Sequence, residues 1–303
     1  MPSVRQLEYL VALADLRHFG RAAQACNTSQ PTLSQQLRAL EERLGVVLVE
    51  RRTSGADLTP IGREVADRAR RVLVEVRDIR QLARRAGDRL VGTLRLGVTP
   101  TLGPYLLPEI VASLHRAQPD LRLYIREGIP DEQALELARG DIDLLLGPLP
   151  IEGAGLEVEP LFRERLFIVA AADHPLAGRS GLAMADLAGA AILSLDQRHH
   201  LHRQVAALCA AHGLSLLRDY EGTSLDSVRQ MVGSGLGLAV LPELYLRSEV
   251  GGEAGIRVLD IADLRASRSI AAAWRGGAAY APDYRRIAEH IQSDARSLLQ
   301  LQD

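Results

Sequence analysis

Apolar residues recur every three or four positions through most of the first ninety residues, a period typical of amphipathic helices. The pattern predicts a first helix that begins with a capping-box spacing at Ser3 and Gln6. A second short helix is predicted over Arg21–Ala25, after which a tight turn leads to a third. This third helix has an N-cap residue at Ser29 and a stop signal at Gly45. Together these elements indicate a helix-turn-helix.

The third helix is predicted to have one apolar and one polar face. Short hydrogen-bonding side chains gather on the polar face near the helix N-terminus, which suits contacts to base edges and phosphates in a DNA major groove. The alternative is an ordinary solvated face of a small helical bundle. With the neighbouring positions that we expect to approach DNA, the candidate residues are Arg21, Ser29, Gln30, Pro31, Thr32, Ser34, Gln35 and Arg38.

A β-rich run follows, with a turn at Ser54–Gly55, and predicts a two-stranded wing in which Arg51 and Arg52 meet the DNA backbone or minor groove.

Thr59 then caps a long helix that we expect to extend to about Ala86. Its apolar residues are spaced nearly as in a heptad repeat, which favours a dimerisation helix. They are Ile61, Val65, Ala69, Val72, Val76, Ile79, Ala83 and Ala86.

From Gly92 onward, predicted strands alternate with predicted helices, as in an open α/β domain. Strands are expected at "TLRLGV", "LRLYIRE" and "IDLLLG", with helices over Leu102–Ala117 and Asp131–Arg139. Such sheets bind ligands beyond the carboxyl ends of their strands. The turns "GVTPTLGPYLL" and "EGTSLDSV" therefore become candidate ligand contacts, although their hydroxyl residues would also serve as plain N-caps.

The segment "LEYLVALADLRHFGRAAQACNTSQPTLSQQLRALEERLGVVLVERR" resembles the winged helix-turn-helix of the LysR-type transcriptional regulators. Within that family, "HFGRAA", "SQPTLS" and "GPYLLP" resemble the peroxide-sensing OxyR subgroup. The resemblance implies a sequence-specific DNA-binding regulator, not an enzyme, without a cofactor. Its expected partners are double-stranded DNA with a two-fold site, a small effector, RNA polymerase and further copies of itself, as a dimer or tetramer.

The same resemblance implies that the body contains two α/β subdomains like those of periplasmic binding proteins, with the effector between them. We place the chain crossings near Glu164–Leu166 and Ser267–Ser269. The expected organisation is a winged helix-turn-helix over 1–59, a linker helix over 60–87, a hinge over 88–91, one subdomain over 92–165 and 268–303, and another over 166–267. The expected effector contacts are Thr99, Thr101, Ile129, Asp196, His199, His200 and Thr223.

The stretch "SLDQRHHLHRQVAALC" lies where OxyR-type proteins have their reactive cysteine, and a second cysteine nine residues later. On this chain the second falls on Cys209, but the first falls on His200. Of two threonines that handle peroxide in the subgroup, one matches Thr101 and the other falls on Pro130. Because imidazole forms neither a sulfenic acid nor a disulfide, we expect no intramolecular disulfide switch. Cys26 belongs to the DNA-binding domain and is expected to lie too far away to pair.

Other interpretations of this stretch remain open. Cys209 alone could respond to peroxide in an activator of oxidative-stress genes, although its apolar surroundings favour an inert thiol. His199 and His202 indicate no complete metal site, because no fourth ligand has suitable spacing. We prefer a pocket-lining role in which His200 points into the space that the cysteine would occupy. For the whole chain, the alternative from another functional class is a cytosolic solute-binding module whose N-terminal domain serves only for assembly.

The charge distribution fits a DNA-binding head, and chance local variation is the alternative. The net charge is only -2, but residues 1–90 contain 16 Arg against 11 Asp and Glu, and the remainder contains 20 against 27. A basic head on an acidic body suits a protein that binds a polyanion through one end. The chain shows no secretion signal, no membrane-length apolar run and only 2 cysteines, so we expect a cytoplasmic location.

Overall fold

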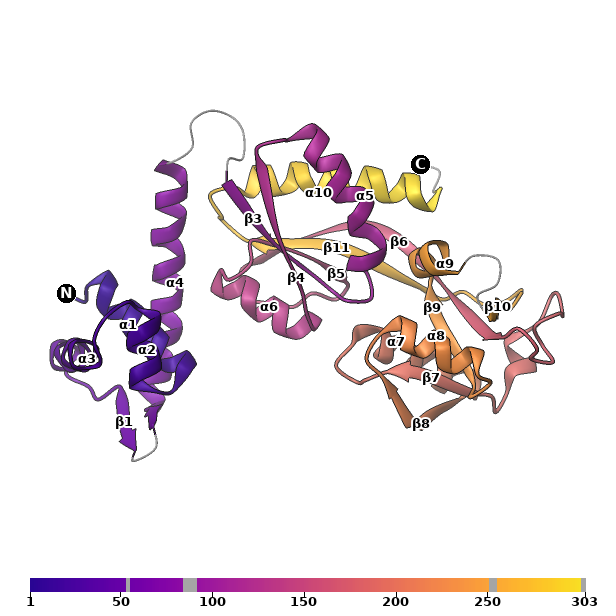
Figure 1. Cartoon of the computed structure of the whole chain (residues 1–303), viewed down its shortest axis with the longest axis horizontal. Coiled ribbons are helices and arrows are strands. Elements are labelled where there is room, and N and C mark those ends of the chain that lie inside the picture. Colours follow the sequence, from indigo (N-terminus) through magenta and orange to yellow (C-terminus); the bar gives the residue numbers. More distant parts are fainter. Residues whose placement is uncertain (53–54, 84–91, 251–254, 301–303) are drawn as a thin grey trace. The chain divides into compact units, whose positions relative to one another are not determined.

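The computed structural model describes residues 1–52, 55–83, 92–250 and 255–300. The chain divides into two compact units, Met1–Arg85 and Ala86–Asp303 (Figure 1). Within the described part, no helix has both the length and the apolar character needed to span a bilayer.

The N-terminal unit is a helical domain with a small two-stranded wing. Its elements are α1 (Val4–Leu16), α2 (Phe19–Ala25), α3 (Gln30–Leu44), β1 (Val49–Arg52), β2 (Gly55–Leu58) and α4 (Pro60–Ala83). Leucines of α1 and α3, alanines of α2 and Ala66 of α4 form one apolar core. The predicted end of the long helix near Ala86 lies outside the described residues, as does part of its apolar seam.

Local capping signals in the sequence set most of these helix ends. The predicted capping box of Ser3 and Gln6 is present, and the Ser29 side chain accepts a hydrogen bond from the Thr32 amide. Gly45 ends α3 with a φ of 69°, a left-handed conformation that favours glycine. The predicted start of α2 at Arg21 is wrong, because the His18 ring accepts from two backbone amides and the helix begins earlier, at Phe19.

The C-terminal unit is built on one mixed sheet with the strand order β4-β3-β5-β11-β6-β9-β7-β8, and β10 pairs with β6. Its elements are β3 (Gly92–Val98), α5 (Gly103–Ala117), β4 (Leu121–Glu127), α6 (Pro130–Arg139), β5 (Leu144–Pro148), β6 (Leu156–Ala171), η1 (Met184–Leu187), β7 (Ala191–Leu195), α7 (His200–His212), β8 (Ser215–Gly222), α8 (Leu225–Gly233), β9 (Leu238–Pro242), α9 (Glu243–Glu249), β10 (Ile256–Val258), β11 (Ser267–Arg275) and α10 (Ala281–Leu299).

The two larger apolar cores of this unit divide it into halves, and a smaller core packs α6 against β5. The first half packs α5 and α10 around β3, β5 and β11, and the second packs α7 and α8 around β7 and β9. Strand β6 contributes Leu161 and Phe162 to the first core and Leu166 and Ile168 to the second. The strand therefore passes from one half into the other, and its partner changes from β11 to β9 between Arg165 and Leu166.

A buried ion pair lies where β6 passes between the halves. Arg268 on β11 stands opposite Glu164 on β6 in the antiparallel register. Its Nε donates to a Glu164 carboxylate oxygen at 2.7 Å, and both side chains are completely buried. The other Glu164 oxygen accepts from the Leu244 amide at 2.7 Å. Both partners belong to the segments where we expected the chain to cross, and the full set of domain boundaries stays a prediction.

Candidate functional site

The polar face of α3 is open to solvent. Leu33, Leu37 and Leu40 point into the core of the N-terminal unit, which leaves the opposite side of the helix on the surface. Of the predicted contacts here, Ser34 is half-buried, and the exposed ones are Arg21, Ser29, Gln30, Pro31, Thr32, Gln35 and Arg38. Such a surface, at the N-terminal part of a helix, is the kind that enters a major groove.

The wing has the predicted antiparallel pairing. In the register of β1 and β2, Arg51 stands opposite Ala56 and Arg52 opposite Gly55. The side chains of Arg51 and Arg52 lie outside the described residues, so their approach to DNA stays a prediction.

Helix α4 uses its apolar residues in two ways. Ala66 and Ala69 are buried, and α4 packs against α1 within the N-terminal unit. Ile61, Val72 and Ile79 are exposed. These three exposed residues leave apolar surface that a partner helix could cover.

The C-terminal unit contains a cavity of about 480 Å³ between α6 and α7. This volume lies within the range typical of binding sites for small organic ligands. Its lining residues are Thr99, Pro130, Asp131, Ala134, Leu135, Leu145, Gly147, Pro148, Pro150, Ile151, Glu152, His200 and Arg203. Helix α6 packs on β3 and β5 of the first half and α7 on β7 of the second, so the cavity lies where the two halves meet.

Asp131 connects the two helices beside this cavity. Its Oδ1 lies 3.2 Å from His200 Nε2, and its Oδ2 accepts from Arg203 at 3.3 Å. Because a carboxylate only accepts hydrogen bonds, the proton of a neutral His200 ring resides on Nε2. The Nδ1 atom is buried and makes no hydrogen bond of good geometry, although the Pro148 carbonyl lies near enough to the ring to raise its pKa.

Burial keeps the His200 ring neutral. Desolvation lowers its pKa, while the hydrogen bond to Asp131 and the Pro148 carbonyl act in the opposite direction. The pKa of Asp131 is also lowered, since the hydrogen bonds from Arg203 and His200 outweigh the opposing effect of partial burial. At neutral pH the pair is therefore a carboxylate and a neutral imidazole.

The two predicted threonines of the first turn have different surroundings. Thr99 lines the cavity, and its buried Oγ1 has no hydrogen-bond partner. Thr101 is not among the lining residues. Its hydroxyl accepts from Arg268 at 2.9 Å, and its carbonyl accepts from the same guanidinium at 2.9 Å. Thr101 thus completes the buried ion-pair network.

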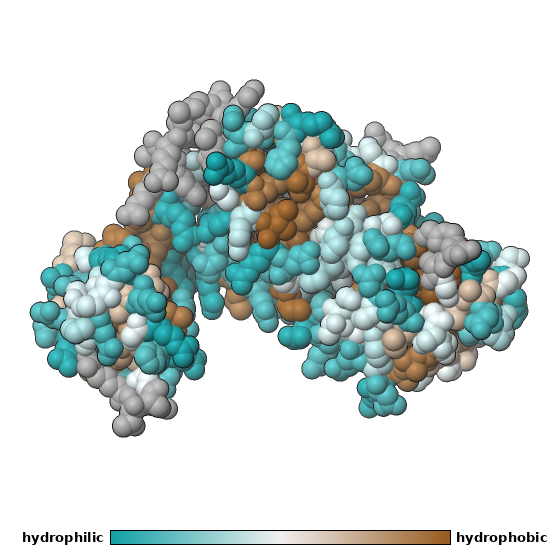
Figure 2. All heavy atoms as spheres, viewed as in Figure 1, coloured by the Kyte–Doolittle hydropathy of each residue, from teal (hydrophilic) through white to brown (hydrophobic). Residues whose placement is uncertain are grey.

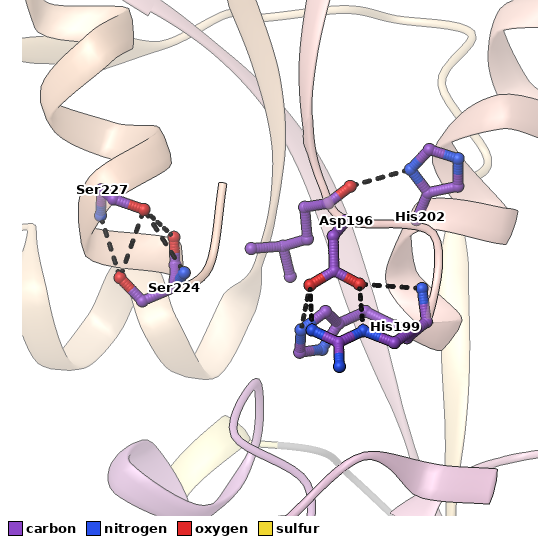
Figure 3. A network of polar contacts seen from close by, with 7 residues as sticks. Asp196, His199, His202, Ser224 and Ser227 are labelled. Carbon is purple, nitrogen blue, oxygen red and sulfur yellow. Dashed lines mark hydrogen bonds and ion pairs between the residues drawn. The ribbon is translucent and has the colours of Figure 1, made fainter. Parts of the chain in front are cut away.

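The other predicted effector contacts lie outside the cavity lining. Asp196 receives hydrogen bonds from the Arg198 side chain and amide and lies 3.7 Å from His199 (Figure 3). His199 is the buried N-cap residue of α7, and burial lowers its pKa. Thr223 is exposed before α8, and Ile129 is the N-cap residue of α6.

The chemistry of the two cysteines differs from that of a reactive pair. Cys209 is buried in the core of the second half, and burial raises its pKa. Cys26 belongs to the N-terminal unit, and its pKa is also raised by burial. A thiol with a raised pKa forms little thiolate, the species that attacks peroxide. Among the described residues, no group of three or more His, Cys, Asp or Glu could hold a metal ion.

Sequence patterns did not reveal Asp131, Arg203, Glu164 or Arg268 as members of these networks. Asp131 and His200 are 69 positions apart, and Arg268 is 167 positions from Thr101. The one indication in the sequence was that the predicted chain crossings between the two halves lie beside Glu164 and Arg268.

Comparison with known proteins places the chain in a family. Residues 4–63 match the family described as "Bacterial regulatory helix-turn-helix protein, lysR family". Residues 87–296 match the "LysR substrate binding domain". The two matches cover both units and agree with the predicted fold class.

Named relatives match over nearly the whole length. The chain is 37% identical to the "Hydrogen peroxide-inducible genes activator" of Haemophilus influenzae, covering 98% of each. It is 38% identical to the "DNA-binding transcriptional dual regulator OxyR" of Escherichia coli K12, covering 96% of this chain and 95% of the relative.

Two solved structures are similar over the full chain. A full-length OxyR from Pseudomonas aeruginosa with a cysteine-to-aspartate substitution has a TM-score of 0.78 and 34% identity, covering 96% of this chain and 94% of that one. A hydrogen peroxide-bound cysteine-to-serine variant of OxyR from Corynebacterium glutamicum has a TM-score of 0.67 and 33% identity, covering 99% and 95%. This chain therefore belongs to the LysR family of transcriptional regulators and is an OxyR-like DNA-binding protein rather than an enzyme.

Proposed function

We propose that this chain is a cytoplasmic regulator whose α3 enters the major groove of a two-fold promoter site, and whose DNA binding responds to a small effector in the cavity beside His200. The observation that carries the effector assignment is the combination of a ligand-sized cavity with two buried polar atoms that make no hydrogen bond of good geometry, Thr99 Oγ1 and His200 Nδ1. Buried polar atoms are normally hydrogen-bonded, so a ligand that satisfies them gains affinity.

The proposed DNA contacts are the exposed α3 residues together with Arg21 and the wing arginines Arg51 and Arg52. Family membership supports the cytoplasmic location and an output through RNA polymerase. The exposed apolar residues Val72 and Ile79 of α4 support a dimer. A tetramer would need a second contact on the C-terminal unit, where hydrophobic residues gather around α5 (Figure 2) and Ile125 is exposed on the edge strand β4.

The residue at the position of the reactive cysteine bears on whether the protein responds to an effector or to oxidation. The relatives named for hydrogen peroxide support a link to oxidative stress. Because His200 stands at the position of the reactive cysteine, we propose control by effector binding rather than by a disulfide within the chain. A second candidate is oxidation of Cys209 alone, which the names of the relatives favour and the burial of this thiol disfavours.

Electrophoretic mobility shifts with the chain's own promoter DNA test this function. Binding to the promoter should exceed binding to a random duplex at rising salt, and His200→Ala should alter the response of that binding to a cell extract of small metabolites. A Cys209→Ser variant in the same assay distinguishes effector binding from oxidation of Cys209. If His200→Ala changes nothing and Cys209→Ser abolishes a response to peroxide, the effector assignment is wrong.

A further inference from the structure

We propose that Glu41 is a positioning residue for DNA binding, which holds the wing against α3 and so sets where Arg51 and Arg52 meet the duplex. In this role Glu41 acts through the wing and does not contact DNA itself. The inference rests on the proposed function, because it concerns how two proposed DNA contacts, the exposed face of α3 and the wing arginines, keep a fixed spacing.

The Glu41 side chain bonds the start of the wing to the end of α3. A single carboxylate oxygen, Oε1, accepts from the Leu48 amide at 2.8 Å and from the Val49 amide at 3.0 Å. Val49 is the first residue of β1, and the Glu41 carbonyl accepts from the amide of Gly45, the residue that caps α3. Hydrogen bonds to an ionised acceptor are roughly twice as strong as those between neutral groups. Two consecutive amides on one oxygen therefore fix the direction in which β1 leaves the helix.

The segment between α3 and β1 depends on this contact. Val46 and Val47 are 37% and 63% exposed, so they contribute little packing, whereas Leu48 is completely buried and Val49 nearly so. If the carboxylate were removed, two amides of buried residues would lose their acceptor. Leaving a buried donor unsatisfied costs about 1–3 kcal/mol, which favours a shift of this backbone toward water.

The carbonyl side of the same segment is bonded to α4. The Leu48 carbonyl accepts from the Thr59 amide at 3.0 Å, and the Thr59 hydroxyl donates to the Val47 carbonyl at 2.8 Å. The Gly62 amide donates to that hydroxyl at 2.9 Å, so Thr59 caps α4. A Cβ on Gly62 would lie 2.1 Å from the Leu48 carbonyl oxygen, so this close approach requires glycine. The Leu48 backbone is therefore held on both sides, with its amide on α3 and its carbonyl on α4.

The second wing strand is connected differently. The Ala56 amide of β2 donates at 3.0 Å to the carbonyl of Arg17, the residue that caps α1. This bond joins neutral backbone groups, and it leads to α1. The Glu41 contact differs in that it is charged and joins the wing to the helix that we propose enters the major groove.

A fixed spacing between α3 and the wing matters for binding a duplex with both. Contacts to the DNA backbone position a protein, and contacts to bases select the sequence. A preorganised surface also has less loop freedom to lose on binding. Loosening the wing should therefore remove the proposed backbone contacts of Arg51 and Arg52 and spare the base contacts of α3.

Fluorescence anisotropy of the full chain with promoter DNA, at several salt concentrations, tests the inference. Glu41→Ala removes the acceptor and should weaken promoter binding about tenfold. The binding should also become less salt-dependent, since each lost phosphate contact reduces the slope of log K against log salt by about 0.9. Glu41→Gln keeps an oxygen acceptor without the charge and should weaken binding only about threefold. Glu42→Ala is the matched control, because Glu42 is the exposed next residue of α3, and it should stay within about twofold.

The wing arginines distinguish positioning from general structural support. In a chain that carries Arg51→Ala and Arg52→Ala, Glu41→Ala should weaken binding by no more than about twofold further, because the contacts that it positions are already gone. A general loss of domain stability would weaken binding by the same factor in both backgrounds. Circular dichroism at the assay temperature checks helix content, and where Glu41→Ala loses it, Glu41→Gln is carried through the same comparison.

Three outcomes overturn the inference. The first is unchanged promoter binding by Glu41→Ala, the second is an equal effect of Glu42→Ala, and the third is an undiminished effect of Glu41→Ala when both wing arginines are absent. If promoter binding does not exceed binding to a random duplex in the unaltered chain, the proposed function itself is wrong. If that preference holds but removing Arg51 and Arg52 changes nothing, the wing contacts and this inference fail while the role of α3 remains.

Discussion

Arg268 Nε lies 2.7 Å from Glu164 Oε2, and neither side chain is accessible to solvent. The same guanidinium donates to the hydroxyl and the carbonyl of Thr101, and the same carboxylate accepts from the Leu244 amide. The network ties β6, β11, α9 and the turn before α5 together where the two halves of the C-terminal unit meet.

Removing one partner of this pair should destabilise the C-terminal unit strongly. Arg268→Met leaves an uncompensated buried carboxylate, and such losses cost about 3–5 kcal/mol. Trp274 is the only tryptophan of the chain and is buried in this unit, so its fluorescence during urea unfolding reports the change. The double variant Arg268→Met with Glu164→Leu should recover part of the loss. A single variant as stable as the unaltered chain would contradict the assigned role.

Arg38 should contribute to specific DNA binding. If it contacts a guanine from the exposed face of α3, Arg38→Ala should cost about 1–3 kcal/mol on the promoter and much less on a random duplex. Fluorescence anisotropy at several salt concentrations measures both. Arg68→Ala serves as a control, because Arg68 is an exposed arginine of α4 in the same unit. Equal losses on both duplexes would assign Arg38 to a phosphate contact.

Cys209 should be slow to react in the folded chain. Its burial and raised pKa predict that alkylation by iodoacetamide at pH 7.5 accelerates by more than about tenfold when urea unfolds the C-terminal unit. Mass spectrometry of the labelled peptides measures the rate, and Cys26, which is only half-buried, provides the internal comparison. Rapid labelling of Cys209 in the folded chain would instead favour the single-cysteine peroxide response.

The stability of the C-terminal unit should fall as the pH falls below the ordinary pKa of histidine. The pKa of His200 is lowered on folding, so the unfolded chain binds the proton first. The stabilisation is present above about pH 6.5 and is lost as the pH drops through the folded-state pKa. His200→Gln should flatten this dependence in Trp274-monitored unfolding between pH 7.5 and 5.5. His199, whose pKa is also lowered, accounts for a remaining slope.

Local signals explain why much of the fold could be predicted. Ser3, Ser29 and Gly45 determine helix ends through hydrogen bonds and backbone angles within a few residues, so the sequence alone identifies them. The start of α2 was missed because a histidine ring provides the cap, a less usual choice than Ser, Thr, Asp or Asn.

The candidate site was only partly predictable, because its members come from distant segments. Thr99 and His200 were expected at the cavity and line it. Asp131 and Arg203 also line it, but nothing in the sequence indicates that α6 and α7 lie beside each other. Thr101 follows a strand just as Thr99 does, and nothing local reveals that a guanidinium far along the chain occupies its hydroxyl. Such pairings depend on the tertiary fold.

The uninterrupted course of β6 limits how the effector domain can respond. Strand β6 pairs with β11 as far as Arg165 and with β9 from Leu166 onward, so its partner changes where it passes between the cores. A change in the angle between the halves can be taken up by a bend at that point, and each half then keeps its own ladder of hydrogen bonds. Backbone rearrangement during a response should therefore be concentrated beside the buried Glu164, while the strands on either side move as rigid pieces.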